Sequence, residues 1–377
     1  MKKFYFLLTA VALTLSINAQ NAFLLLENAI SNLPEEYSET EDAPIAENPE
    51  QNAANWFNAQ YVTKGIGSFI STGEIAGAFE AGIKTIWVNV DRVGLADIRN
   101  AGLTDGVVSD LKAFVQAGGN LLLTKQATMV AHRIGRIYAP NFENGGYNLG
   151  NDVWAINPQL GLNPDAGGVV DRSDHPIYED VEWDNTLYKY TVAIDEETSE
   201  EYYYNVLPLV GAVPRTDNNC MWVDLFRKDP ENPTEKLVET EETIEQDITH
   251  YANLDHRRIE DFEADWNCHM LACWGHVTDF CSAGIVEMFP EGEFQGTVMG
   301  IGFAAYQWGN SNDYIANVKK LTKNTLNYLT GEITPEGIEE VMAAKGAKGI
   351  YNLLGQKVSD MVPGQIYIVN GQRIILR

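Results

Sequence analysis

The sequence feature that most constrains the fold is an alternation of short apolar strands with amphipathic helices. Ile83 to Val90 (IKTIWVNV) is a β-branched run typical of a buried parallel strand, and Asn120 to Thr124 (NLLLT) is a second apolar run. Between them, Thr104 to Ala117 has helical spacing, begins at a threonine N-cap and ends before Gly118-Gly119. Such strand–helix–strand units form right-handed crossovers, so the pattern predicts an α/β fold with a parallel sheet.

Further elements extend this unit on both sides. Apolar periodicity predicts strands at 22–26, 67–70, 268–274, 283–289 and 296–305, and helices at 49–61, 72–81 and 313–329. Residues 136–265 are rich in Asn, Gly, Pro and acidic residues, which favours a long irregular insertion. We therefore expect one α/β domain over residues 20–330.

The first nineteen residues have the pattern of a secretory signal peptide. Lys2 and Lys3 are followed by an apolar run from Phe4 to Ile17 and by Ala19 before the expected cleavage point. No later segment reaches the roughly 18 continuous apolar residues that a transmembrane helix needs. The sequence therefore predicts an extracytoplasmic protein, which is periplasmic, attached to the cell surface or secreted.

The last part of the chain differs in character from the α/β domain. Residues 331–348 have the composition of a linker, and residues 349–377 predict a small β unit. Asn370-Gly371 between two apolar runs is the signature of a type I′ hairpin turn.

Charge and cysteine content restrict the partners and the cross-links. The chain has 53 acidic and 26 basic residues and a formal net charge of -27, which argues against nucleic acid as a partner. It has four cysteines. Cys268 and Cys273 lie five positions apart in a predicted strand, so we expect them to face opposite sides and not to bridge each other. A bridge from Cys220 to one of the later cysteines is left open, as is the oligomeric state.

Several stretches resemble a known superfamily. IWVNVDRVGLAD (86–97), VVSDLKAFVQAGGNLLLTKQAT (107–128) and IGR (134–136) are similar to the core of ThuA-like proteins, in the class I glutamine amidotransferase-like superfamily. GTVMGIGFAAYQWGNSNDYIANVKKLTKNTLNYL (296–329) resembles their final strand and helix. With LACWGHVTDF (271–280), the chain resembles an uncharacterised gut-bacterial group, domain of unknown function 4960, some members of which carry glycoside hydrolase labels. The resemblance implies a flavodoxin-like three-layer fold and an association with carbohydrate.

The tail has a resemblance of its own. YNLLGQKV and GQIYIVNGQ resemble the C-terminal sorting domains of type IX secretion in Bacteroidetes. A sorting signal and a stabilising β appendage are both open interpretations.

The resemblance also indicates where a nucleophile would be expected. The amidotransferase fold places it on a sharp turn after a central strand, close to a helix N-terminus that lowers a thiol pKa. Here the turn has Thr124-Lys125-Gln126, with neither cysteine nor serine. We therefore expect no glutamine amidotransferase activity and no covalent intermediate at Thr124 or at a cysteine.

Three stretches, around residues 132–136, 274–279 and 306–308, are expected to supply a ligand site. Each follows a predicted parallel strand, and the ends of such strands share one edge of a sheet. Tryptophan can stack on a sugar ring, and His or Asp can bond its hydroxyls. The sequence thus predicts glycan binding, with glycoside hydrolysis open and a non-catalytic scaffold or protein-interaction module as the alternative. The competing interpretation of the aromatic residues is core packing. The predicted ligand-binding residues are His132, Arg136, Trp274, His276, Asp279, Tyr306 and Trp308.

Hydrolysis and metal binding have weaker support. Most glycosidases use two carboxyl groups about 5 to 9.5 Å apart. Candidates near predicted loop edges are Asp91, Asp152, Asp171, Asp174, Asp279 and Glu287.

A metal site is not expected either. The potential ligands lack CxxC or HExxH spacing; they are Cys273, His269, His276 and Cys281. No cofactor is expected.

Overall fold

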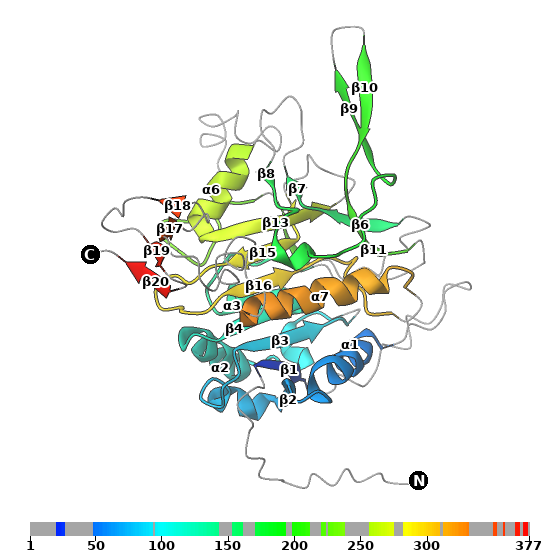
Figure 1. The fold of residues 1–377 in the computed structure, drawn as a ribbon. Coiled ribbons are helices and arrows are strands. Elements are labelled where there is room, and N and C mark those ends of the chain that lie inside the picture. The colour runs from blue at the N-terminus through cyan, green and yellow to red at the C-terminus, as the bar shows by residue number, and fades with distance from the viewer. Residues whose placement is uncertain are drawn as a thin grey trace, which may run out of the picture.

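The computed structural model describes residues 20–26, 48–92, 95–142, 153–160, 170–193, 198–211, 220–223, 225–237, 256–274, 282–309, 312–331 and four short segments between 350 and 375. Its centre is a nine-stranded sheet with the order β11-β6-β13-β15-β16-β4-β3-β1-β2, and helices cover both faces (Figure 1). The expected α/β class is confirmed. The expected signal peptide lies outside the described residues.

One half of the sheet is parallel. It contains β1 (Asn21–Leu25), β2 (Gly67–Ser71), β3 (Thr85–Val90), β4 (Asn120–Lys125) and β16 (Val298–Ile301). These strands lie side by side in the order β2-β1-β3-β4-β16, and every neighbouring pair is parallel. The strand–helix–strand pattern of the sequence predicted this half correctly.

The other half is antiparallel, which corrects the expectation of a parallel sheet throughout. It contains β15 (Ile285–Met288), β13 (Cys268–Trp274), β6 (Trp154–Asn157) and β11 (Leu207–Val210), paired antiparallel from β16 outwards. The segment between β15 and β16 turns back through reciprocal hydrogen bonds between Glu291 and Phe294. It is too short for a parallel crossover, which needs a dozen or more residues. The predicted insertion 136–265 also supplies two strands, β6 and β11, to the main sheet.

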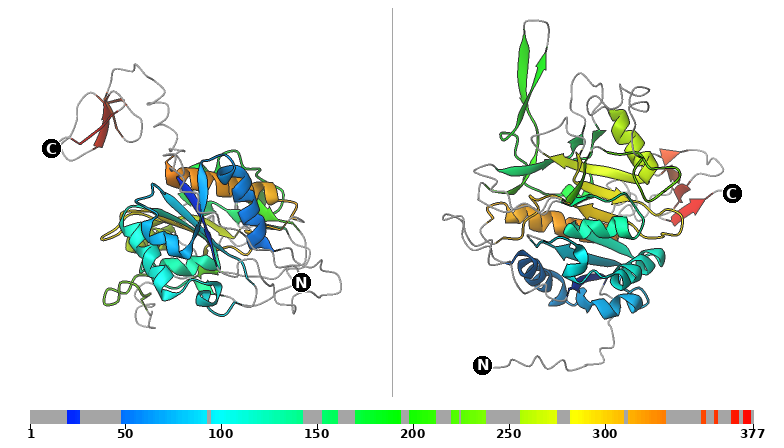
Figure 2. Two further views of the ribbon diagram at one scale, coloured as in Figure 1. Left: turned by 90° about the horizontal axis from the view of Figure 1, so that it is seen from below. Right: turned by 180° about the vertical axis from the view of Figure 1, so that it is seen from behind.

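Two hydrophobic cores lie on opposite faces of the sheet, because alternate side chains of a strand point to opposite sides. Ile86 and Val88 of β3 pack on one face and Trp87 on the other. The first face is covered by the 3-10 helix η3 (Thr72–Gly77), α2 (Asp105–Gln116), α3 (Met129–Arg133) and α6 (His256–Trp266). The second is covered by α1 (Pro49–Phe57), its π-helical continuation η2 (Asn58–Val62), the 3-10 helix η6 (Pro176–Tyr178) and α7 (Ile315–Thr330) (Figure 2).

The ends of two helices follow the sequence signals. The side chain of Thr104 accepts a hydrogen bond from the Val107 backbone N–H at the start of α2, as expected of an N-cap. Helix α7 ends at Gly331, which adopts a left-handed conformation with φ 78°. The helix predicted at 72–81 is instead the short η3. The 3-10 helix η4 (Ile98–Ala101) precedes α2, and η5 (Gln126–Thr128) follows β4.

A β-bulge in β13 changes the side that one cysteine faces. The register against β15 shifts between Met270 and Ala272, so the alternation of side chains is inverted beyond that point. Cys268 and Cys273 therefore both pack in the core on the sheet face that α2 covers, and the expectation that they face opposite sides is wrong. Both are buried free cysteines.

Smaller sheets complete the described structure. The hairpin of β9 (Lys189–Ala193) and β10 (Ser199–Tyr203) projects from the body (Figures 1 and 2). Short pairings join β5 (Asn141–Phe142), β12 (Cys220–Val223) and β14 (Ser282–Ala283), and β7 (Gln159–Leu160) with β8 (Val170–Asp171). The tail forms an antiparallel sheet of β17 (Ile350–Asn352), β18 (Lys357–Val358), β19 (Ile366–Val369) and β20 (Gln372–Ile375). Within the described part of the chain, no helix has the length and apolar character to cross a membrane.

Candidate functional site

The sharp turn expected after the central strand is present at Lys125. This residue ends β4 with φ 58° and ψ −127°, and the chain passes directly into η5. A residue with a side chain is strained in this backbone conformation, and such strain is concentrated at functional sites. The fold thus forms the turn, and a lysine side chain stands on it.

Lys125 is buried, and its ammonium group has polar partners. Its side chain is 1% exposed. Nζ donates to the carbonyl oxygen of Ala304 at 3.0 Å and lies 3.5 Å from Oδ1 of Asp91. A buried charge is tolerated only with such partners, because removal from water is otherwise very costly.

Glu50 and Arg92 extend this buried polar group to α1. Glu50 Oε1 accepts hydrogen bonds from the Asp91 backbone N–H and from Arg92 Nε, each at 2.9 Å. Burial raises the pKa of Glu50, and the hydrogen bond and charge of Arg92 oppose this effect. Gln126 bonds both backbone groups of Arg92 at 2.8 Å. We call Glu50, Asp91, Arg92, Lys125 and Gln126 the elbow cluster.

The elbow cluster connects the start of α1 with the ends of β3 and β4. It holds two carboxylates and two cationic groups that contact one another, so its chemistry is that of an internal ion-pair network. Sequence reasoning examined the turn at 124–126 but did not single out Glu50 or Arg92. A charged residue directly after each of two apolar strands points to Asp91 and Lys125, but no signal of this kind marks Glu50 or Arg92.

The predicted aromatic residues lie in the core. Trp274 is 5% exposed, and its ring centroid lies 4.6 Å from that of Trp154 and 4.8 Å from that of Phe303. Tyr306 and Trp308 are also buried. β13 runs in the same direction as β16, because both are antiparallel to β15. Trp274 is the last residue of β13, so it does lie at the carboxyl edge of the parallel strands, as expected. Its burial matches the core interpretation rather than an exposed sugar platform.

His132 and Arg136 have other surroundings. The Nδ1 atom of His132 lies 3.1 Å from the carbonyl oxygen of Ile137 within the same short segment. Arg136 donates to the carbonyl oxygen of Phe289 and lies 3.5 Å from Glu291. Phe289 follows β15 at the amino edge of the parallel strands, so the expectation that Arg136 lies at the carboxyl edge is corrected. Helix α3 takes the chain back along the sheet before Arg136 is reached.

The five predicted ligand-binding residues that the structure describes are therefore not brought together in one site. His276 and Asp279 lie outside the described residues. The others occupy the core, the α3 segment and the amino edge of the sheet.

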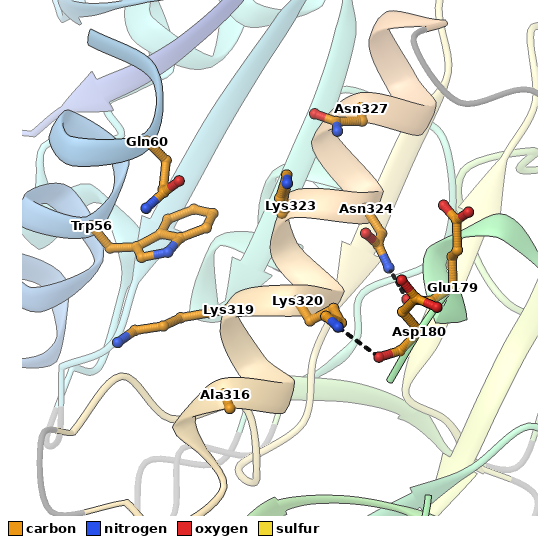
Figure 3. Close-up of a pocket in the computed structure, with 10 residues that line it drawn as sticks. All are labelled: Trp56, Gln60, Glu179, Asp180, Ala316, Lys319, Lys320, Lys323, Asn324 and Asn327. Atoms are coloured by element: carbon orange, nitrogen blue, oxygen red, sulfur yellow. Dashed lines mark hydrogen bonds between the residues drawn. The ribbon is translucent and has the colours of Figure 1, made fainter. Parts of the chain in front are cut away.

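A groove of about 570 Å³ lies over α7, on the sheet face that α1 and α7 cover. It was not predicted from the sequence, although Trp56 lay in a predicted helix and the KKLTK segment was part of another. The residues that line it are Trp56, Gln60, Glu179, Asp180, Ala316, Lys319, Lys320, Lys323, Asn324 and Asn327 (Figure 3).

Helix α7 divides the groove into two sides. Lys319 and Lys323 lie on the side of α7 that faces Trp56, whereas Lys320 turns towards Asp180 (Figure 3). Lys320 Nζ donates to the Asp180 carbonyl oxygen at 2.8 Å. On the α1 side, the indole of Trp56 rests on the core, with its centroid 5.1 Å from that of Trp308. We call Trp56, Gln60, Lys319, Lys323 and Asn327 the α1 side of the groove.

A second hollow of about 400 Å³ lies beside the start of α2. Its two arginines have partners: Arg99 pairs with Asp97, and Arg133 pairs with Asp105. This hollow therefore presents balanced charges to a ligand.

The carboxylates considered for hydrolysis lie apart or have partners. Glu287 is 2% exposed, accepts a hydrogen bond from the Tyr328 hydroxyl at 2.7 Å and lies 3.3 Å from His175 Nε2. Asp91 belongs to the elbow cluster, and Asp171 accepts from Gln159 at the surface. Asp174 is exposed. Asp152 and Asp279 lie outside the described residues.

The cysteines and the potential metal ligands also have defined surroundings. Burial raises the pKa of the Cys273 thiol to about 12, and that of Cys268 well above its usual range, so both thiols stay protonated at neutral pH. Within the described residues, no three His, Cys, Asp or Glu side chains gather as a metal site requires.

Comparisons with known proteins add little. No protein-family model matches the chain, and no curated protein matches it. A solved cytoplasmic protein from Salmonella typhimurium is similar with a TM-score of 0.34 and 10% identity, over 82% of this chain and 98% of that one. A GH42 β-galactosidase is similar with a TM-score of 0.31 and 10% identity, over 95% of this chain and 38% of the β-galactosidase chain. Likenesses this weak carry no argument about function.

Proposed function

We propose that this protein binds carbohydrate in the groove over α7. The observation that carries the proposal is the partly buried indole of Trp56 in a groove that the amide side chains of Gln60 and Asn327 also line. An aromatic ring can stack on the apolar face of a sugar, and amide groups can bond the oxygen atoms at its edge. An aromatic surface with a few convergent polar groups is what a sugar site requires.

The site is preformed. The ring of Trp56 packs edge-on against Trp87 and Tyr61, with centroid distances of 6.0 Å to each. A fixed aromatic side chain loses little freedom when a ligand binds, which favours affinity. The site thus retains the expected ligand class, but on residues other than those predicted from the sequence.

The proposal is tested with a glycan array on the protein, followed by calorimetric titration of the best ligand. Trp56→Ala should weaken binding on the order of tenfold, since stacked aromatics contribute about 0.5 to 1.5 kcal/mol beyond their buried area. Tyr203→Ala, an exposed aromatic on the β9–β10 hairpin, is the control and should bind as the wild type does. Thermal melting of both variants identifies a loss caused by unfolding. Equal binding by folded Trp56→Ala protein would remove the groove as the site.

We also propose that the fold is a variant of the flavodoxin-like, glutamine amidotransferase-like architecture. The order β2-β1-β3-β4-β16 supports this, because in chain order it is 2-1-3-4-5, the flavodoxin arrangement. The proposed function is binding without amidotransferase chemistry, since Lys125 stands on the turn. Hydrolysis is not included, because Asp91 and Glu287 are held by Lys125 and Tyr328. Extracytoplasmic location and type IX sorting remain proposals that rest on the sequence.

One observation favours a protein-interaction role as the second candidate. The projecting β9–β10 hairpin exposes Tyr202 and Tyr203, at 44% and 54%. Exposed tyrosines are common at protein interfaces. A Tyr202→Ala, Tyr203→Ala variant that loses a partner while keeping its glycan ligand would support this role.

A further inference from the structure

We infer that the groove over α7 selects an acidic glycan, one that carries carboxylate or sulfate groups. This inference rests on the proposed function and specifies its ligand class. It follows from the hydrogen-bonding direction of the side chains on the α1 side of the groove.

Both amide groups have their oxygen atoms occupied by the protein itself. Gln60 Oε1 accepts a hydrogen bond from Lys64 Nζ at 3.0 Å. Asn327 Oδ1 accepts one from the hydroxyl of Tyr61 at 3.1 Å. The Lys64 ammonium can only donate, so its bond fixes Oε1 as the acceptor end of Gln60 and leaves the N–H₂ group as a donor for a ligand. The Asn327 N–H₂ group is a donor in the same way when Oδ1 accepts from Tyr61.

The lysines add two further donors on the same side. Lys319 and Lys323 are exposed on the side of α7 that faces Trp56 (Figure 3). An ammonium group donates hydrogen bonds and accepts none. Four polar side chains around Trp56 thus offer donors, whereas the carboxylates that line the groove, Glu179 and Asp180, lie on the other side of α7 beside Lys320.

A lining of donors discriminates among sugars. A neutral sugar presents hydroxyl groups, which need acceptors as well as donors to be fully bonded. Carboxylate and sulfate groups only accept, and their hydrogen bonds to cationic donors are about twice as strong as neutral ones. The formal net charge of -27 repels an acidic ligand from most of the surface, so such a ligand can bind only where cations outnumber carboxylates, as on the α1 side of the groove.

The experiment compares three polymers by affinity electrophoresis and calorimetry. Polygalacturonate carries carboxylates, chondroitin sulfate carries sulfate groups as well, and dextran is neutral. We expect the wild type to bind at least one acidic polymer tenfold or more tightly than dextran. The double variant Lys319→Gln, Lys323→Gln should lose at least tenfold of that binding. The matched control Lys84→Gln, Lys189→Gln changes the net charge equally away from the groove and should stay within twofold.

A second variant removes the Gln60 donor without changing side-chain size. Gln60→Glu replaces the amide by an acceptor that is also negatively charged, so binding of the acidic polymer should fall while the melting temperature stays unchanged. Dextran bound as tightly as the acidic polymers, or acidic binding unaffected by the lysine and Gln60 variants, would overturn the inference. If Trp56→Ala alone then abolished binding of a neutral glycan, the proposed function would stand without it. If no polymer bound and the array were blank, both would fall.

Discussion

Glu50 occupies an interior position where its ionisation and the stability of the fold depend on each other. Its pKa is raised above the ordinary value of 4.5, chiefly by burial. As pH rises from 4.5, the unfolded chain loses this proton before the folded one does. The contribution of Glu50 to stability is therefore full below that pH and is lost as pH rises through the raised pKa.

This predicts the pH dependence of Glu50→Gln, which cannot ionise. The free energy of unfolding of the wild type minus that of the variant should fall as pH increases above 4.5, by at most about 1.4 kcal/mol per unit. Urea unfolding of both proteins between pH 4 and pH 8 measures the difference. A difference that grows with pH would mean that the ion pair with Arg92 outweighs burial.

A substitution at Trp274 tests whether this tryptophan, which the sequence placed in a ligand site, supports the core instead. Trp274→Ala should reduce the free energy of unfolding by about 3–5 kcal/mol, because a buried aromatic leaves a cavity between Trp154 and Phe303. Tyr203→Ala is the matched surface change and should stay within about 0.5 kcal/mol. Thermal and urea unfolding give both values. A small loss at Trp274 would show that its ring does not support the core.

The β9–β10 hairpin is an element whose removal should leave the body intact. Its base is held by a hydrogen bond from the Tyr204 N–H to the Tyr188 carbonyl and by one from the Tyr188 hydroxyl to Val153. A two-stranded ribbon is marginally stable by itself. Replacing residues 190–202 by Asn-Gly should therefore change the free energy of unfolding by less than about 1 kcal/mol, measured in urea. A loss of several kcal/mol would indicate that the strands support the main sheet.

Local sequence signals predicted most elements of the fold. Thr104 and Gly118-Gly119 predicted the limits of α2 because caps act within one helical turn. The direction of β15 could not be read in the same way, because it depends on the short reversal at Glu291–Phe294. The face of Cys273 depends on a bulge, which the strand period does not reveal.

The functional residues were harder to predict than the elements that carry them. Glu50, Arg92 and Lys125 come from three separate elements and form a cluster only through the topology of the sheet. Trp274 and Trp56 have the same residue type, and only tertiary packing makes the first fully buried and the second partly exposed. The donor character of Gln60 and Asn327 depends on partners that composition cannot show.

The whole molecule carries enough negative charge for self-repulsion to affect its stability. With a formal net charge of -27, the folded state concentrates like charges that the unfolded chain separates. Raising ionic strength from about 0.01 M to 0.15 M shortens the screening length from roughly 30 Å to 8 Å. The melting temperature should therefore rise by a few degrees over this range in calorimetry, with NaCl and KCl acting alike. A fall would show that attractive ion pairs dominate.

The position of β16 beside β4 affects how the chain is made in the cell. Asn120, at the start of β4, accepts a hydrogen bond from the backbone N–H of Thr297, which is 177 residues further along the chain. At ribosomal speeds of about 5–20 residues per second, that partner is synthesised roughly 10 to 35 seconds after β4. Until then one edge of an apolar strand, with Leu121, Leu122 and Leu123, has no partner from β16. Open apolar edges invite aggregation, so the β4 edge is an aggregation hazard for as long as the chain is being synthesised.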